Sequence, residues 1–219
     1  MSPRVRLLAL QLPATLVILA WVPGNVTKLM ALLLLWGLTF RRLSRAELVL
    51  AAGACLFFTL MNLAALRQGI FAFRHPDVLG LPAYEFVMWG FYLLHTQRVL
   101  AGPLPPPPRG FTWALAAAYA AAFALVADPA ALLMVSGALL LAGLVRYHQP
   151  MDLAYVAYMT LLGAAIEYTG VWSGQWYYPG DPPGGVPPWF LTLWGGVGLF
   201  LRRLLWPLVA RHEPAGIPH

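Results

Sequence analysis

The sequence is poor in charged residues and nearly free of cysteine. Asp, Glu, Lys and Arg make up 10% of its 219 residues, against about 25% in an average soluble domain. The single cysteine, Cys55, excludes an internal disulfide framework and a cysteine-ligated metal site. The remainder is rich in apolar residues, at 60% hydrophobic with a mean hydropathy of +0.70. This composition favours a protein whose solvent is a lipid bilayer.

The positive charge of the chain does not indicate nucleic-acid binding. The formal net charge is +6, but the Lys and Arg residues stand singly or in pairs between apolar segments. Basic stretches that bind nucleic acid are clustered, whereas membrane anchors lie at the ends of apolar segments. We therefore expect contact with the lipid bilayer and none with nucleic acid.

Eight apolar stretches predict an all-α, polytopic membrane helical bundle of about eight transmembrane helices. They cover residues 7–22, 28–40, 46–66, 84–101, 111–127, 130–145, 152–172 and 188–209. A crossing needs about 20 apolar residues, and at least about 17. Stretches 28–40 and 130–145 are shorter than this, so they are tilted, thin the bilayer or form a re-entrant pair.

The distribution of basic residues predicts the orientation of the helices. If both termini are inside, eleven basic residues lie at inner ends and three at outer ends. The inner residues are Arg4, Arg6, Arg41, Arg42, Arg45, Arg98, Arg109, Arg146, Arg202, Arg203 and Arg211, and the outer ones are Lys28, Arg67 and Arg74. Because inner loops carry the excess of Lys and Arg, we expect this orientation in a bacterial-type inner membrane.

The chain also contains an internal repeat with a period of 105 residues and no gap. Glycine, proline, tryptophan and arginine recur in register, so the similarity is more than shared leucine and alanine. The matched pairs include Gly69 and Gly174, Gly80 and Gly185, Pro82 and Pro187, Trp89 and Trp194, and Arg98 and Arg203. We therefore predict two four-helix units, 1–105 and 106–219. With an even number of crossings each, the units are parallel copies related by an axis along the membrane normal.

Two carboxyl groups within the apolar stretches are the candidate catalytic residues, Glu85 and Glu167. Ionisable residues in a membrane are costly and usually functional. Helical spacing places Glu85 on one face with Trp89 and Tyr92. An acid beside aromatic faces can protonate an apolar substrate and stabilise the resulting cation. The alternative for Glu85 is a helix N-terminal charge that complements the helix dipole.

The candidate substrate-binding residues are Asn62, which is equivalent to Glu167 in the repeat, and the aromatic residues near the two acids. These aromatic residues are Tyr84, Trp89, Tyr92, Trp176, Trp189 and Trp194. No metal site is expected, because His95 lies ten residues beyond Glu85, about 15 Å along a helix. The other histidines, His75, His148, His212 and His219, lack ligand spacing. No cofactor motif is present, so none is expected.

The repeated motif resembles the lycopene cyclase domain, which occurs in tandem in carotenoid cyclases. The first unit reads Asn62, then Gly69-Ile70-Phe71-Ala72-Phe73, then Gly80-Leu81-Pro82-Ala83-Tyr84-Glu85. The second reads Glu167, then Gly174-Gln175-Trp176-Tyr177-Tyr178, then Gly185-Val186-Pro187-Pro188-Trp189. The resemblance implies a redox-neutral cyclisation of a linear carotenoid end group. In that reaction an acid protonates the terminal double bond and a base removes a proton after ring closure.

The family pattern also has a paired glutamate that this chain lacks. Of that pair, the first unit keeps Glu85 alone, and the second unit has Phe190 at the equivalent position. Glu85 and Glu167 then remain as an acid–base pair across the two units.

Three functions follow as hypotheses. The first is a lycopene cyclase-like intramolecular lyase or isomerase acting on an apolar polyisoprenoid or carotenoid. The second is a non-catalytic protein that binds such a lipid or acts as a scaffold, as a homo-oligomer or in a complex of carotenogenic enzymes. The missing glutamates favour this second hypothesis. The third is a small-solute transporter, for which Glu85, Glu167 and Asn62 are the available polar residues.

Overall fold

The computed structural model describes residues 3–210, and the side chains from residue 7 onward. Five residues used in the charge and metal analysis lie outside that part, by their side chains or entirely: Arg4, Arg6, Arg211, His212 and His219.

The helices match the eight apolar stretches to within a few residues at each end. They are α1 (Pro3–Trp21), α2 (Asn25–Phe40), α3 (Arg45–Arg67), α4 (Glu85–Val99), α5 (Gly110–Leu125), α6 (Pro129–Arg146), α7 (Pro150–Trp172), α8 (Trp189–Phe200) and α9 (Trp206–Ala210). A five-residue π-helical turn, η2 (Leu201–Leu205), joins α8 to α9, so the eighth stretch is one helix with a local widening. A short 3₁₀ turn, η1 (Pro183–Gly185), precedes α8.

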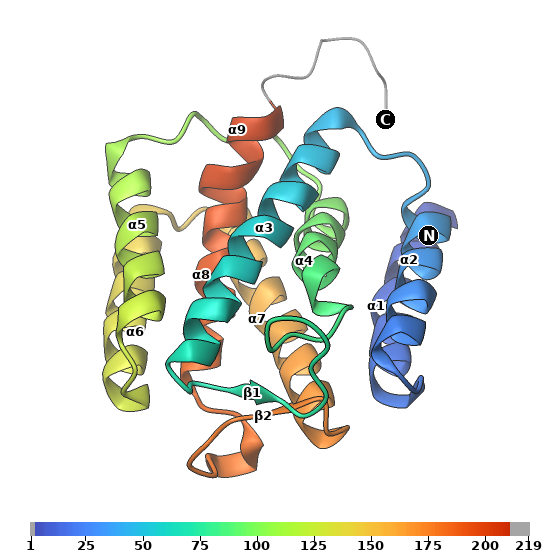
Figure 1. The fold of residues 1–219 in the computed structure, drawn as a ribbon. Helices are drawn as coiled ribbons and strands as arrows, with labels where there is room; N and C mark the ends of the chain where they lie inside the picture. The colour runs from blue at the N-terminus through green and yellow to red at the C-terminus, as the bar shows by residue number, and fades with distance from the viewer. Residues whose placement is uncertain (1–2, 211–219) are drawn as a thin grey trace.

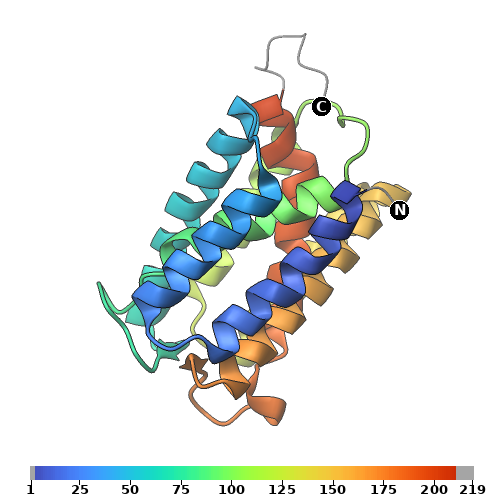
Figure 2. The same ribbon diagram turned by 90° about the vertical axis from the view of Figure 1, so that its right-hand side faces the viewer.

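Four helices form the centre of the bundle, and a helix pair lies on each side of them. Figure 1 shows α3, α4, α7 and α8 in the middle, with α1 and α2 on one side and α5 and α6 on the other. Helix α1 packs along α7, as Figure 2 shows, and α5 packs against α3. Each flanking pair therefore contacts a helix of the other predicted unit, so neither unit encloses a separate core.

A two-stranded antiparallel ladder joins the two long loops at one end of the bundle. Strand β1 (Ala72–Phe73) pairs with β2 (Trp176–Tyr177), with Ala72 opposite Tyr177. These strands were not predicted from the sequence. Both follow a glycine in the left-handed region, Gly69 with φ 69° and Gly174 with φ 72°, where a residue with a side chain is disfavoured. The glycines end α3 and α7 in the same way.

At the opposite end, two ion pairs recur at the repeat spacing. Arg98 contacts Glu47 and Arg203 contacts Asp152, each at 2.5 Å. Both acids also cap the helices that they begin. Glu47 accepts a hydrogen bond from the backbone N–H of Ser44 at 2.8 Å, and Asp152 accepts one from the backbone N–H of Gln149 at 3.1 Å. The predicted duplication requires such recurrence, and the division into units 1–105 and 106–219 stays a prediction.

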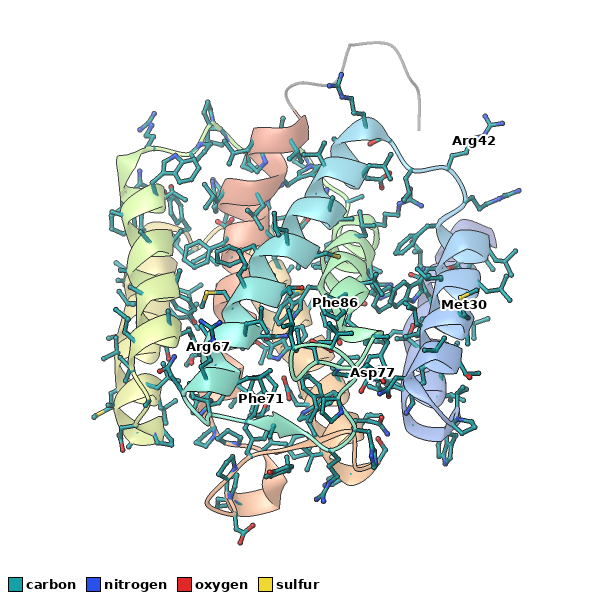
Figure 3. The ribbon with its side chains drawn as sticks, viewed as in Figure 1. Met30, Arg42, Arg67, Phe71, Asp77 and Phe86 are labelled. Carbon is teal, nitrogen blue, oxygen red and sulfur yellow. The ribbon has the colours of Figure 1, made fainter. Side chains whose placement is uncertain are left out.

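The outer surface of the bundle is apolar. On α2, for example, Met30 is 62% exposed and Leu34 is 64% exposed, and Figure 3 shows Met30 pointing away from the bundle. Large exposed apolar surfaces are typical of lipid contact. By length and composition, three described segments can cross a bilayer, namely Arg45–Arg67, Pro129–Arg146 and Pro183–Ala210. The stretch 130–145, which we expected to be too short for a full crossing, therefore belongs to a helix long enough to span a bilayer. The total of eight crossings stays a prediction.

Candidate functional site

A cavity of about 600 Å³ lies among the four central helices and α5. Its wall is formed by residues of α3, α4, α5, α7, α8, η2 and α9, and β1 and β2 contribute at one end. Nearly all of the lining is apolar or aromatic, and Asn62, Glu85 and Glu167 are the polar exceptions apart from tyrosine and tryptophan. This size and lining are typical of sites for small apolar ligands.

Glu167 is held by three donors at the buried end of the cavity. Its Oε2 accepts hydrogen bonds from Trp176 Nε1 at 3.1 Å and from the Tyr178 hydroxyl at 2.7 Å. Its Oε1 accepts a third from Trp194 Nε1 at 3.1 Å. Burial raises the pKa of the Tyr178 hydroxyl, and the charge of Glu167 raises it further, so Tyr178 stays protonated and donates. Glu167 thus connects three aromatic side chains from β2, the following loop and α8.

Glu85 has fewer partners. Its Oε1 accepts a hydrogen bond from Asn62 Nδ2 at 3.0 Å, the one hydrogen bond found to this carboxyl among residues 3–210. The residue is only 8% exposed, and its side chain faces the cavity. Asn62 stands where the second unit has Glu167. The acid of the first unit therefore lies on α4 and that of the second on α7, and both line the same cavity.

Stacked aromatic rings form the middle of the wall. The rings of Trp89 and Trp194 stack with their centroids 4.8 Å apart and their planes at 18°. Phe58 stacks on the other face of Trp89, and Tyr92 contacts the edge of Trp194 at 5.0 Å. Offset stacking of this kind stabilises a rigid aromatic surface.

One side of the cavity opens between α3 and α5. Three lining residues at this opening are about half exposed, Val49 at 52%, Phe57 at 47% and Trp113 at 50%. Helix α5 contributes three alanines to the lining, Ala116, Ala117 and Ala120, beside three aromatic residues. The short alanine side chains leave space that larger residues would fill. Since this flank of the bundle is apolar, the opening faces the hydrocarbon region of a membrane.

Of the nine predicted site residues, eight line this cavity and one does not. The eight are Glu85, Glu167, Asn62, Trp89, Tyr92, Trp176, Trp189 and Trp194. Tyr84 lies apart from it, with its hydroxyl 3.4 Å from Gln175 Oε1 and its ring 5.7 Å from Lys28 Nζ. The reason is its place immediately before α4, where the chain turns the side chain toward α2 and the second long loop.

The sequence prediction missed several lining residues. Tyr178 completes the Gly-x-Trp-x-Tyr motif, so its place in the motif was a signal. Phe58 gave no signal, because an aromatic residue in an apolar helix is common. The alanines of α5 were a weak signal, since eight of the eleven residues from 114 to 124 are alanine.

A separate polar network is buried outside the cavity. His95 lies between Gln11 Oε1, 2.7 Å from its Nδ1, and the Tyr158 hydroxyl, 2.6 Å from its Nε2. It joins α1, α4 and α7, as polar side chains often do between membrane helices. Over the residues that the structure describes, no three His, Cys, Asp or Glu side chains are arranged to hold a metal ion.

Comparison with known proteins identifies solved structures with a similar fold. No family model matches the chain, and no curated protein matches it significantly. Two solved structures do, both of MvINS, a mycobacterial Insig homologue from Mycobacterium vanbaalenii, one of them a cross-linked trimer. Each has a TM-score of 0.62 at 20% identity and covers 79% of this chain and 98% of the other. This likeness confirms the all-α membrane helical bundle.

The same comparison corrects the expected function. The sequence led us to expect carotenoid cyclisation, and that prediction is wrong, because the solved structures with this fold are of an Insig homologue rather than a carotenoid cyclase. Non-catalytic binding of an apolar lipid, which was the alternative, fits better. The resemblance to the lycopene cyclase domain stays a prediction, since no family model matches. Enzymatic activity of any other kind is likewise untested.

Proposed function

We propose that this chain is a non-catalytic membrane protein that binds one elongated, apolar lipid of the polyisoprenoid class. The observation that carries the proposal is the cavity of about 600 Å³. It is lined by apolar and aromatic side chains and opens between α3 and α5. A ligand that reaches its site from the hydrocarbon region need not pass through water, so a lipid is the natural occupant.

The aromatic wall supports a ligand with a flat or unsaturated chain. The stacked rings of Trp89 and Trp194 leave little freedom for the wall to rearrange. Flat unsaturated chains pack well against such rings. A polyisoprenoid with conjugated double bonds, such as a carotenoid, has this shape.

Glu85 supports a ligand with a hydroxyl group at one end. One oxygen of this carboxyl accepts from Asn62, and the side chain lines the cavity. The other oxygen of Glu85 has no donor among the described residues and is not sealed off from the cavity. A ligand hydroxyl supplies that donor, and Glu167 has its own three donors already.

The transporter hypothesis has less support. A path for polar solutes needs polar groups along its length. In the cavity, the ionisable carboxyls and Asn62 gather near one end, and the remainder of the lining offers no continuous polar path.

Location and assembly are also part of the proposal. We place the chain in a bacterial inner membrane with both described ends of the bundle inside, on the basis of the arginine distribution. A homo-oligomer is proposed too, and the cross-linked trimer described for MvINS supports it by analogy of fold.

The test is expression of the chain in two bacterial hosts, one that accumulates lycopene and one that accumulates a dihydroxylated carotenoid. After purification in mild detergent, bound pigment is extracted and identified. We expect both pigments to co-purify unchanged. Glu85→Gln should weaken retention of the hydroxylated pigment and leave lycopene retention as in wild type. A cyclised product above the level of the empty host contradicts the non-catalytic proposal, and absence of both pigments contradicts lipid binding.

A further inference from the structure

A second cleft, of about 310 Å³, lies at the end of the bundle opposite β1 and β2. It is enclosed by the proline-rich link before α5, the first turn of α5, the end of α6, the short link from α6 to α7, and η2. Its lining is mostly polar, in contrast to the lipid cavity. Arginine is its dominant charged residue, with Arg109, Arg146 and Arg203 around the cleft.

The positive charge of the cleft is only partly neutralised. Arg203 forms the floor and is paired with Asp152, at 2.6 Å from Nε to Oδ1. The salt bridges among the described residues leave Arg109 and Arg146 without a carboxylate partner. Both are exposed at the rim. Two uncompensated charges therefore face one cleft, about the charge of one phosphate group.

Neutral hydrogen-bonding groups complete the cleft. The hydroxyls of Thr112 and Tyr147 are 2.6 Å apart and both residues line it. The Tyr147 ring lies under Arg203 and Arg146, with guanidinium carbons 4.8 Å and 5.2 Å from its centroid. Stacking of this kind fixes the direction of a guanidinium. Arg146 and Arg203 are thus partly oriented before any ligand binds.

The cleft lies at the level of lipid headgroups. Phe111 and Trp113 follow Arg109 on the first turn of α5 and are 45% and 50% exposed. Half-exposed aromatic residues beside arginines at a helix end are typical of the membrane–water interface. Helices α5 and α6 form one flank of the bundle, so the cleft borders the lipid there.

We propose that this cleft is a binding site for a phosphate group, supplied by the headgroup of an anionic phospholipid or by free phosphate. Basic pockets between membrane helices on the inner side bind phosphate-bearing headgroups, and planar guanidinium groups match phosphate geometry. The site is independent of the lipid cavity, because the two share no lining residue.

The matched variants are two double substitutions with equal loss of charge. Arg109→Ala/Arg146→Ala removes the uncompensated charge of the cleft. Arg42→Ala/Arg45→Ala removes two exposed arginines at the same end of the bundle, outside the cleft. Figure 3 shows Arg42 pointing away from the bundle. Equal thermal midpoints in phosphatidylcholine nanodiscs establish that all three proteins are folded.

Binding is measured with two probes, phosphatidylglycerol in nanodiscs and inorganic phosphate added to the protein in phosphatidylcholine nanodiscs. We expect the cleft variant to lose at least about tenfold in affinity for the probe that wild type binds, and the control to change less than about twofold. Binding of phosphatidylglycerol alone identifies a lipid site, and binding of both identifies a general phosphate site. Equal loss in both variants, or loss in neither, overturns the proposal.

Discussion

Trp89 and Trp194 stack on each other at the centre of the bundle, although they stand 105 residues apart and occupy equivalent positions of the repeat. If the chain is two copies of one unit, as predicted, such equivalent residues meet at the two-fold axis that relates the copies. Ala72 and Tyr177, also equivalent, are opposite each other in the antiparallel ladder. The axis therefore runs from the ladder through the tryptophan stack. The lipid cavity lies beside this axis, which explains why both units contribute to it.

The ion pair of the second unit should contribute more to stability than that of the first. Asp152 is fully buried and the Arg203 side chain is 7% exposed, whereas the Arg98 side chain is 23% exposed. Removing one partner of a buried pair leaves an uncompensated charge. We expect Asp152→Asn to lower the free energy of unfolding in detergent by about 3 kcal/mol, and Glu47→Gln by clearly less.

Denaturant titration of both variants in the same detergent measures this difference. Replacing the pair with apolar residues, Asp152→Leu with Arg203→Met, should recover part of the loss because no charge remains buried. Equal losses for Asp152→Asn and Glu47→Gln would contradict the account.

Glu167→Gln should destabilise the cavity wall more than Glu85→Gln does. A glutamine offers one acceptor oxygen and an NH₂ group, so it cannot accept from Trp176, Tyr178 and Trp194 at once. We expect a loss of about 2 kcal/mol for Glu167→Gln and a shift in tryptophan emission. Glu85→Gln keeps an acceptor for Asn62 and should leave both nearly unchanged. Identical emission spectra for wild type and Glu167→Gln would show that the three bonds do not hold the wall.

A glycine of α7 permits the tryptophan stack. A Cβ added at Gly163 would overlap the ring of Trp194, whereas one added at Gly37 on α2 meets nothing within 4 Å. Gly163→Ala should therefore displace Trp194 and lower stability by about 2 kcal/mol, as overpacking does. Gly37→Ala should raise it by about 0.5 kcal/mol, because alanine favours a helix interior. Thermal melts of both variants test this, and a neutral Gly163→Ala would contradict the packing described for Trp194.

Much of the fold was predictable because apolar length and turn residues are local signals. The eight stretches match the helices, and the repeat pointed to the glycines that end α3 and α7. The π-helical turn was not predictable. It arises where Pro207, which has no N–H, interrupts the normal hydrogen bonds, and Trp206 donates to the Leu201 carbonyl instead.

The site was predictable where residues follow helical spacing and not where loops fold back. Glu85, Trp89 and Tyr92 share a face of α4 and all line the cavity. Tyr84 precedes the helix, and its direction depends on a contact with Gln175 that lies 91 residues away. The function was mispredicted because the motif contains Glu85 and Glu167, which suggested acid catalysis. The shape and opening of the cavity depend instead on small residues of α5, which the motif does not include.

Filling the cavity from α5 tests lipid binding most directly. Ala120 lines the cavity, and Ala118 lies on the same helix, exposed and outside it. The measurement is the amount of polyisoprenoid retained per chain by wild type, Ala120→Phe and Ala118→Phe, purified in parallel from the carotenoid-producing hosts. We expect Ala120→Phe to retain at least about tenfold less, a difference near 1.4 kcal/mol, and Ala118→Phe to retain as much as wild type. Equal retention by all three proteins would contradict the claim that this cavity is the lipid site.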